Sequence, residues 1–224
     1  MTEKRDKIIG GGDGPEIYKL RLTYSKTGLI RFISHRDLIR VLFRAFSRAG
    51  LPVAYSRGYS PHPVVSFCPP LKVGMEGLNE RLDLSLTGTP AGAETAGILN
   101  PHLPEGIEIK DSRVLSAGEP SLNARLEAAE YRVDPEEPFR VSREAVDNFL
   151  AAAEIRMVWR RGGKEKEIDA RAGVKSLVRE GEGGVRMVLS LKENCQPYPV
   201  LIALSGADPA HLPGWRWQRL GFLP

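Results

Sequence analysis

Residues 17–24, IYKLRLTY, and residues 34–49, SHRDLIRVLFRAFSRA, decide the fold of this chain. In the first stretch apolar and polar side chains alternate, which is the period-two pattern of a half-buried β-strand. In the second, Ser34 followed three residues later by Asp37 predicts a capped helix start, and Gly50 predicts the helix end. The helix carries an apolar stripe made of Leu38, Leu42, Ala45, Phe46 and Ala49. A strand followed by an amphipathic helix is therefore the first piece of structure.

The chain after this helix continues with short strands and one further helix. We expect strands at 53–56, 64–67 and 81–86, a helix at 93–99 and a strand at 107–115. The order is then strand, helix, two strands, helix, strand. This is the order of a ferredoxin-like (βαββαβ) unit, in which both helices cover one face of an antiparallel sheet.

A similar order begins again after the turn formed by residues 118–120. The expected elements are a strand at 129–133, a helix at 142–153, strands at 155–160, 165–170, 174–179 and 185–191, a short helix at 200–204 and a strand at 215–220. We therefore predict an α+β protein made of two tandem ferredoxin-like units, the second distorted. The predicted divisions are a flexible, glycine-rich leader at 1–15, a first unit at 16–118 and a second unit at 119–224.

Composition places the chain among folded proteins, with 42% hydrophobic and 27% charged residues in 224. No apolar run approaches the roughly 18 residues of a membrane span, and the charged start lacks the apolar core of a signal peptide. We therefore expect a cytoplasmic protein with no membrane partner. Cys68 and Cys195 lie far apart and form no CxxC pattern. The chain alone thus predicts neither an iron-sulfur cluster nor a zinc or other metal site.

Charge is distributed unevenly along the chain. Residues 17–75 contain ten lysines and arginines against a single acidic residue, Asp37, for a net charge of +9, whereas the whole chain carries only +4. A positive field of this size attracts polyanions such as nucleic acid. The alternative is that the mildly acidic remainder folds back and neutralises the basic block.

Four arginines recur every fourth residue on the first predicted helix: Arg36, Arg40, Arg44 and Arg48. At 1.5 Å per residue they form one row with a spacing of about 6 Å, which suits successive phosphates. Each like-charge pair four residues apart costs about 0.2–0.5 kcal/mol, so the row is unfavourable without a partner. The alternatives are a solvated helix face or an internal match to an acidic strand of the second unit.

The stretch from residue 56 to residue 70 is too rich in proline and glycine for a central strand, which predicts a rigid, exposed loop. Tyr59 and His62 could stack on bases and Arg57 could bind phosphate, although a purely structural loop is the equal alternative. His35 falls at the first helical turn, where backbone N–H groups favour anions. The residues predicted to contact RNA are Arg31, His35, Arg36, Arg40, Arg44, Arg48, Arg57, Tyr59, His62 and Lys72.

Aromatic and cationic residues alternate near the end of the chain, in WRWQR (215–219). This pattern is compatible with an edge strand that stacks bases. Two tryptophans on one strand face are, however, more often part of a core.

Four stretches carry a resemblance to a known family: YKLRLTY (18–24), RFISHRDL (31–38), GYSPHP (58–63) and GMEG (74–77). They resemble the bacterial radical-SAM-linked protein family, an uncharacterised domain encoded beside, or fused to, a B12-binding radical SAM protein. The resemblance covers most of residues 17–200. It implies a radical SAM partner that carries SAM, an iron-sulfur cluster and cobalamin, while this chain holds no cofactor of its own.

Charge, the arginine row and this resemblance together predict an RNA-binding accessory protein. It would recognise the substrate, tRNA or rRNA, for a radical SAM modification enzyme. The sequence leaves enzymatic activity open, and we expect the chain not to be catalytic on its own. One alternative is a metal-independent endoribonuclease centred on His35, with Tyr24, Lys26 and Arg31 nearby. Another is a protein-only adaptor whose basic face docks the radical SAM partner. The oligomeric state and the identity of the RNA are not specified by the sequence.

Overall fold

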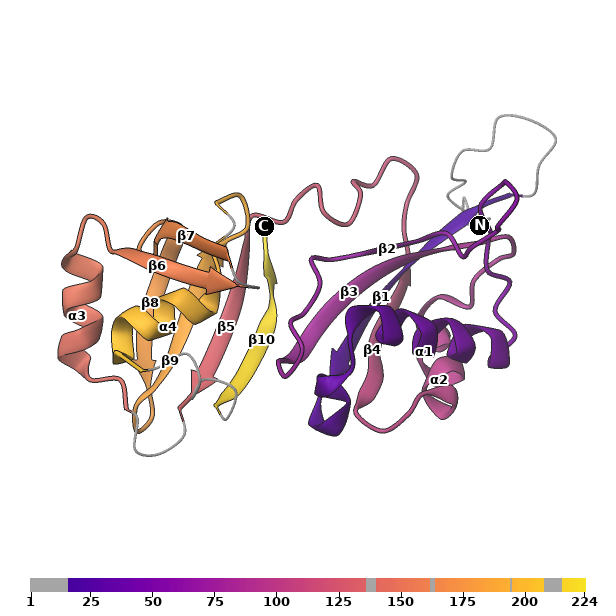
Figure 1. Ribbon diagram of the computed structural model, residues 1–224. Helices are drawn as coiled ribbons and strands as arrows, with labels where there is room; N and C mark the ends of the chain where they lie inside the picture. The colour runs from indigo at the N-terminus through magenta and orange to yellow at the C-terminus, as the bar shows by residue number, and fades with distance from the viewer. Residues whose placement is uncertain (1–15, 136–139, 162–163, 194, 208–214) are drawn as a thin grey trace, which may run out of the picture. The chain divides into compact units, whose positions relative to one another are not determined.

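The computed structural model describes residues 16–135, 140–161, 164–193, 195–207 and 215–224 (Figure 1). The chain is a mixed α+β protein that divides into two compact units, Met1–Arg125 and Leu126–Pro224. The described strands pair in antiparallel fashion within each unit, and four α-helices lie among the described residues. The predicted leader at 1–15 and the predicted turn at 162–163 lie outside the described residues.

The first unit has two α-helices and four strands in the order in which the sequence predicts them. The elements are β1 (Tyr18–Lys26), η1 (Gly28–Phe32), α1 (His35–Arg48), β2 (Val65–Phe67), β3 (Glu76–Leu86), η2 (Gly92–Glu94), α2 (Thr95–Leu99), η3 (Asn100–His102) and β4 (Ile107–Val114). Strand β1 pairs with β4 and with β3, and β2 also pairs with β3. Because Leu84 of β3 lies opposite both Leu20 of β1 and Val65 of β2, β3 lies between β1 and β2.

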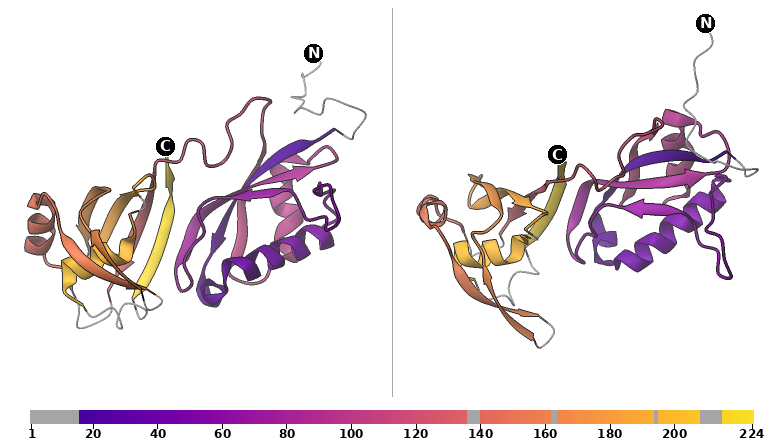
Figure 2. Two further views of the ribbon diagram at one scale, coloured as in Figure 1. Left: turned by 45° about the horizontal axis from the view of Figure 1, so that its top comes forward. Right: turned by 90° about the horizontal axis from the view of Figure 1, so that it is seen from above.

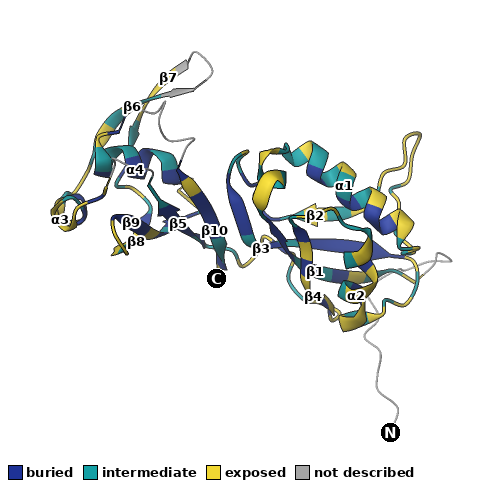
Figure 3. Cartoon of the chain, turned by 90° about the horizontal axis from the view of Figure 1, so that it is seen from below, coloured by how far each residue is buried: buried dark blue, intermediate teal, exposed yellow. Residues whose placement is uncertain are grey.

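One hydrophobic core joins both helices of this unit to its sheet. Leu20 and Leu22 of β1 are fully buried, which confirms the alternation predicted for residues 17–24. They pack in one cluster with side chains of α1, β3, α2 and β4, among them Leu38, Leu42, Phe46, Leu82, Leu84, Leu99 and Ile109. Along α1, exposed residues recur between these buried ones (Figure 3). The helix thus has one face in the core and one in solvent.

The local signals at the ends of α1 are confirmed. The Ser34 hydroxyl accepts a hydrogen bond from the Asp37 N–H at 3.2 Å, and Gly50 takes the left-handed conformation at φ +67°. The strand predicted at 53–56 is wrong, since this stretch forms only the isolated bridges Val53 to Leu86 and Tyr55 to Pro63. Pro52, which precedes the stretch, and Pro63, which lies opposite Tyr55, have no N–H to donate to a continuous ladder.

The second unit also contains a four-stranded antiparallel sheet and two α-helices. Its elements are β5 (Ala128–Asp134), α3 (Arg143–Ala151), β6 (Arg156–Arg161), β7 (Lys164–Asp169), β8 (Val174–Glu180), β9 (Gly184–Ser190), α4 (Pro197–Ser205) and β10 (Arg216–Leu223). The sheet order is β10-β5-β9-β8, whereas β6 and β7 pair only with each other. This hairpin runs apart from the other strands of its unit (Figure 2).

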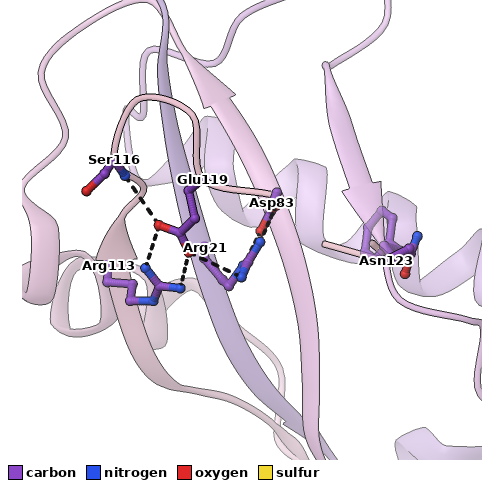
Figure 4. Close-up of polar contacts among 7 residues, drawn as sticks. Arg21, Asp83, Arg113, Ser116, Glu119 and Asn123 are labelled. Atoms are coloured by element: carbon purple, nitrogen blue, oxygen red, sulfur yellow. Dashed lines mark hydrogen bonds and ion pairs between the residues drawn. The ribbon is translucent and has the colours of Figure 1, made fainter. Parts of the chain in front are cut away.

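The segment that follows β4 is held on the first sheet by polar contacts (Figure 4). Glu119 accepts hydrogen bonds from the Arg113 guanidinium and from the Ser116 N–H, and the Asn123 amide donates to the Phe67 carbonyl of β2 at 3.2 Å. Residues 119–125, which the sequence pattern assigns to the second unit, therefore lie with the first.

Candidate nucleic-acid interface

Helix α1 presents all four arginines of the predicted row to solvent. Arg36, Arg40, Arg44 and Arg48 are each exposed, because the apolar stripe of the same helix faces the core. Arg40 forms an ion pair with Asp37 at 3.1 Å, and Arg48 donates to the His102 carbonyl at 2.5 Å. Within the described part of the chain, the side chains of Arg36 and Arg44 make no hydrogen bond or ion pair. The row therefore has donors left for an external anion.

The loop between α1 and β2 is closed by its own polar contacts. The Ser56 N–H donates to the His62 carbonyl at 2.9 Å, and the Ser56 hydroxyl lies 2.9 Å from the His62 Nδ1. Tyr59, at the tip, is fully exposed, and Arg57 is exposed beside it. One ring nitrogen of His62 thus serves the loop itself, while Tyr59 leaves a whole aromatic face open to stacking.

His35 lines a small pocket at the start of α1. The other lining residues are Tyr24, Lys26, Leu38, Cys68, Pro69, Pro70, Leu71 and Glu80. The His35 ring also meets the Phe67 ring edge-on at 5.2 Å. Tyr24 and Lys26 therefore do lie beside His35, whereas Arg31 does not line this pocket. Its ionisable side chains include an imidazole, an ammonium group and a carboxylate, which are kinds of group that acid-base chemistry uses.

Lys26 is the most deeply buried charged side chain of this pocket, with 1% of its surface exposed. Its Nζ donates to the carbonyl oxygens of Ile33 at 2.9 Å and of Arg31 at 3.2 Å. Burial lowers the pKa of the ammonium group below its ordinary value, and the charge of Glu80 partly opposes that shift. The two carbonyl contacts identify Lys26 first of all as a group that holds the backbone of residues 31–33.

Arg31 and Lys72, which the sequence assigns to RNA contact, differ from the arginine row in their surroundings. The Arg31 guanidinium lies 4.5 Å from the centroid of the Phe32 ring and donates to the Gly28 carbonyl at 3.1 Å. Its Nη1 is also 3.9 Å from a carboxylate oxygen of Glu76. Lys72 is half-buried. Arg31 is thus engaged in organising its own turn.

Sequence reasoning missed a cluster of ion pairs on the sheet face opposite the helices (Figure 4). Arg21 contacts Asp83 through two hydrogen bonds of 2.7 and 2.8 Å, and Glu119 bridges Arg113 and Arg21. The Asp83 contact raises the pKa of Arg21, and the Arg113 contact lowers that of Glu119. Acidic residues outside the basic block thus neutralise Arg21. The only sequence signal for this contact was the position of Arg21 in the strand, where it alternates with the core residues Leu20 and Leu22.

The aromatic residues of β10 belong to the core of the second unit. Trp215 and Trp217 are buried, and the Trp217 ring stacks on Tyr198 with centroids 4.1 Å apart. This confirms the core interpretation of the WRWQR stretch. Both cysteines are free thiols, and burial raises the pKa of Cys195 to about 11. No group of three or more His, Cys, Asp or Glu side chains that could hold a metal ion occurs in the described ranges.

Comparison with known proteins places the chain in a family. The sequence profile of the bacterial family described as "Uncharacterized protein conserved in bacteria (DUF2344)" matches residues 19–197. The chain belongs to this family. The match begins in β1 and runs into α4, so it includes α1, the loop at 56–63 and most of the second unit. No curated protein matches the sequence. No helix in the described part of this family member is long and apolar enough to cross a membrane.

Proposed function

We propose that this protein is an RNA-recognition module that presents tRNA or rRNA to a B12-binding radical SAM modification enzyme. The observation that carries the proposal is the exposed row of four arginines on α1. The side chains of Arg36 and Arg44 form no hydrogen bond or ion pair with the described residues, and each lies four residues from another arginine of the row. A polyanion with regularly spaced phosphates supplies a partner for them. The radical SAM enzyme is part of the proposal because of the family resemblance carried by the four motifs within residues 18–77.

The proposal includes a tandem ferredoxin-like architecture. In the first unit, β3 lies between β1 and β2, and β4 lies on the other side of β1, which gives the order β4-β1-β3-β2. In the second unit the order is β10-β5-β9-β8. With the β6–β7 hairpin set aside, the two orders correspond strand by strand, and so do the helices α1 with α3 and α2 with α4. This correspondence supports a repeated βαββαβ unit with an inserted hairpin in the second copy.

A division of labour between helix and loop follows from their chemistry. Guanidinium groups of the row contact phosphates and give affinity without sequence preference. Tyr59, which is exposed at the tip of the Pro-rich loop, stacks on an unpaired base. Since the loop is closed by the Ser56 and His62 contacts, little conformational entropy is lost when it binds.

Binding of purified protein to tRNA and to total RNA, measured across a salt titration, tests the proposal. We expect the affinity to fall steeply and linearly with the logarithm of the salt concentration. Tyr59→Ala should weaken binding with little change in that slope, and variants of the row should lower the slope. Absence of RNA binding at low salt, combined with loss of a protein partner in the same variants, would leave only the adaptor interpretation.

The pocket beside His35 favours one second candidate, a metal-independent endoribonuclease. Lys26 and Glu80 lie in the same pocket as the imidazole, but both are buried and Lys26 already donates to two backbone carbonyls, so His35 is the group that acid-base cleavage at a 2′-hydroxyl would use. Incubation of RNA with the protein in EDTA tests this candidate. Cleavage that is lost in His35→Ala would establish it, whereas intact RNA that remains bound would support recognition without catalysis.

A further inference from the structure

Three large apolar side chains of the first unit gather in solvent beside the start of α1. Leu29 is 86% exposed, Val73 54% and Phe32 52%. Leu29 and Phe32 are three residues apart on η1, and residues at this spacing eclipse each other on a 3₁₀-helix. Ile30 and Ile33 of the same segment pack against the core instead. In residues 29–33, Leu29 and Phe32 therefore face solvent, whereas Ile30 and Ile33 face the core.

Val73 belongs to the turn that lies against this segment. The Gly74 N–H donates to the Arg31 carbonyl at 2.9 Å, and a Cβ at Gly74 would lie 3.8 Å from the Phe32 ring. We call Leu29, Phe32 and Val73 the apolar platform. Exposed apolar groups that occur singly are ordinary, but a group of three on two adjoining turns indicates an interaction site.

The backbone that carries the platform is fixed by buried polar groups. Lys26, which is almost inaccessible, donates to the carbonyls of Arg31 and Ile33, and the Gly28 N–H donates to a Glu76 carboxylate oxygen at 3.1 Å. The Thr27 N–H donates to the Gly106 carbonyl at 2.8 Å. Fixing the turn in advance lowers the entropic cost of binding, so the platform is preorganised for a partner.

The chemistry of the platform favours a protein over a nucleic acid. Leu29 and Val73 are aliphatic and have no π-face on which a base could stack. The Arg31 guanidinium already covers one face of the Phe32 ring, with its Cζ 4.5 Å from the ring centroid. A base would thus meet few stacking surfaces, whereas leucine- or methionine-type side chains of a protein would bury all three groups.

The charges next to the platform specify its partner further. Arg31 and Lys72 adjoin the apolar groups in sequence and Arg36 follows on α1, so the charged residues next to the platform in sequence are cationic. We propose that Leu29, Phe32 and Val73 form the docking surface for a partner protein whose matching face has apolar side chains bordered by carboxylates. The proposal does not depend on RNA binding by the arginine row.

Photo-crosslinking in the bacterial cell, followed by affinity measurements, tests this surface. Benzoylphenylalanine at position 73 of the full-length chain should crosslink to one protein, and the same probe at Val178 serves as control. Val178 is 54% exposed like Val73 but lies in the second unit. The captured protein is then purified, and its dissociation constant is measured with parent and variant chains.

The outcomes are distinct. Leu29→Ser with Phe32→Ser should weaken the complex on the order of tenfold or more, added salt should weaken it further, and Val178→Ser should leave it unchanged. Because Leu29 and Phe32 are both exposed, the melting curve of the double variant should match that of the parent protein. A crosslink to RNA, to a second copy of this chain, or to the same proteins as the Val178 control would overturn the proposal. Unchanged affinity of Leu29→Ser with Phe32→Ser would overturn it as well.

Discussion

Replacement of Arg36 and Arg44 by glutamine should weaken RNA binding while stabilising the protein. Both side chains are exposed, and neither forms a hydrogen bond or ion pair with the described residues. The row contains three like-charge pairs four residues apart, and the double variant removes all three. At about 0.2–0.5 kcal/mol per pair, α1 should gain about 0.6–1.5 kcal/mol. Arg36 also attracts Asp37, so the lower end of this range is expected.

The effect on RNA binding follows from counterion release. Each lost phosphate contact lowers the slope of log affinity against log salt by about 0.7–0.9, so two lost contacts lower it by about 1.4–1.8. Between about 50 and 200 mM salt, the ratio of parent to variant affinity should then shrink by about 7- to 12-fold. Fluorescence anisotropy with labelled tRNA measures the slope, and urea unfolding measures the stability.

A variant with the same change in net charge is the control. Lys110→Gln with Arg143→Gln removes two exposed positive charges outside the row. We expect this variant to keep a slope close to that of the parent. The reasoning is refuted if the Arg36 and Arg44 variant binds RNA with the parent's slope. It is also refuted if that variant is less stable than the parent, since the arginines would then have a structural role.

Three further predictions concern single positions. Ser34→Ala should lower the free energy of unfolding by about 1 kcal/mol, because the Asp37 N–H loses its acceptor. The Ser34 hydroxyl also lowers the pKa of Asp37 in the folded protein. The stability that comes from this contact is therefore present at a pH above the unfolded-state pKa of Asp37, and it is lost as the pH falls through the folded-state pKa. An NMR titration in which the Asp37 pKa does not rise in Ser34→Ala would contradict the contact. Tyr59→Ala should cost about 1–3 kcal/mol of RNA-binding free energy without a change in melting temperature, and equal binding would exclude stacking. Gly106→Ala should lower the free energy of unfolding in urea by about 3 kcal/mol or more, for two reasons: the new Cβ would clash with the Thr27 carbonyl oxygen, and the residue has a φ of +86°. Gly118→Ala, at φ +81° with open space around it, should lose only about 1–2 kcal/mol; similar losses at both positions would mean that the clash is relieved.

Sequence alone predicted the parts of the fold in which local pattern and burial agree. Residues 17–24 and 34–49 have regular periods and a cap, and the structure has β1 and α1 there. Strand β3 begins at Glu76, well before the predicted residue 81. Polar residues at its start look like a loop in the sequence. They are accommodated because Gly77 pairs with Lys26 and the Glu76 carboxylate accepts the Gly28 N–H, contacts between distant residues that no local pattern reveals.

The candidate site divides in the same way. Exposure of the arginine row could be predicted, since helical spacing fixes which face each residue occupies. The ion pairs of Arg21 with Asp83 and Glu119 could not be predicted from the sequence. They depend on the register between β1 and β3 and on the path of the chain after β4. Counting charges along residues 17–75 therefore overstates the field available to a polyanion.

The contacts of the segment after β4 also determine where the first unit can be separated from the rest of the chain. A fragment that stops at residue 118, after the apparent turn, loses Glu119 and Asn123. It leaves the Arg113 guanidinium and the Phe67 carbonyl without these partners, and Arg21 keeps only Asp83. A fragment that extends to Arg125 keeps every one of these contacts. The compact first unit is thus longer than the βαββαβ pattern, and its last residues hold β1, β2 and β4 of the same sheet through polar contacts.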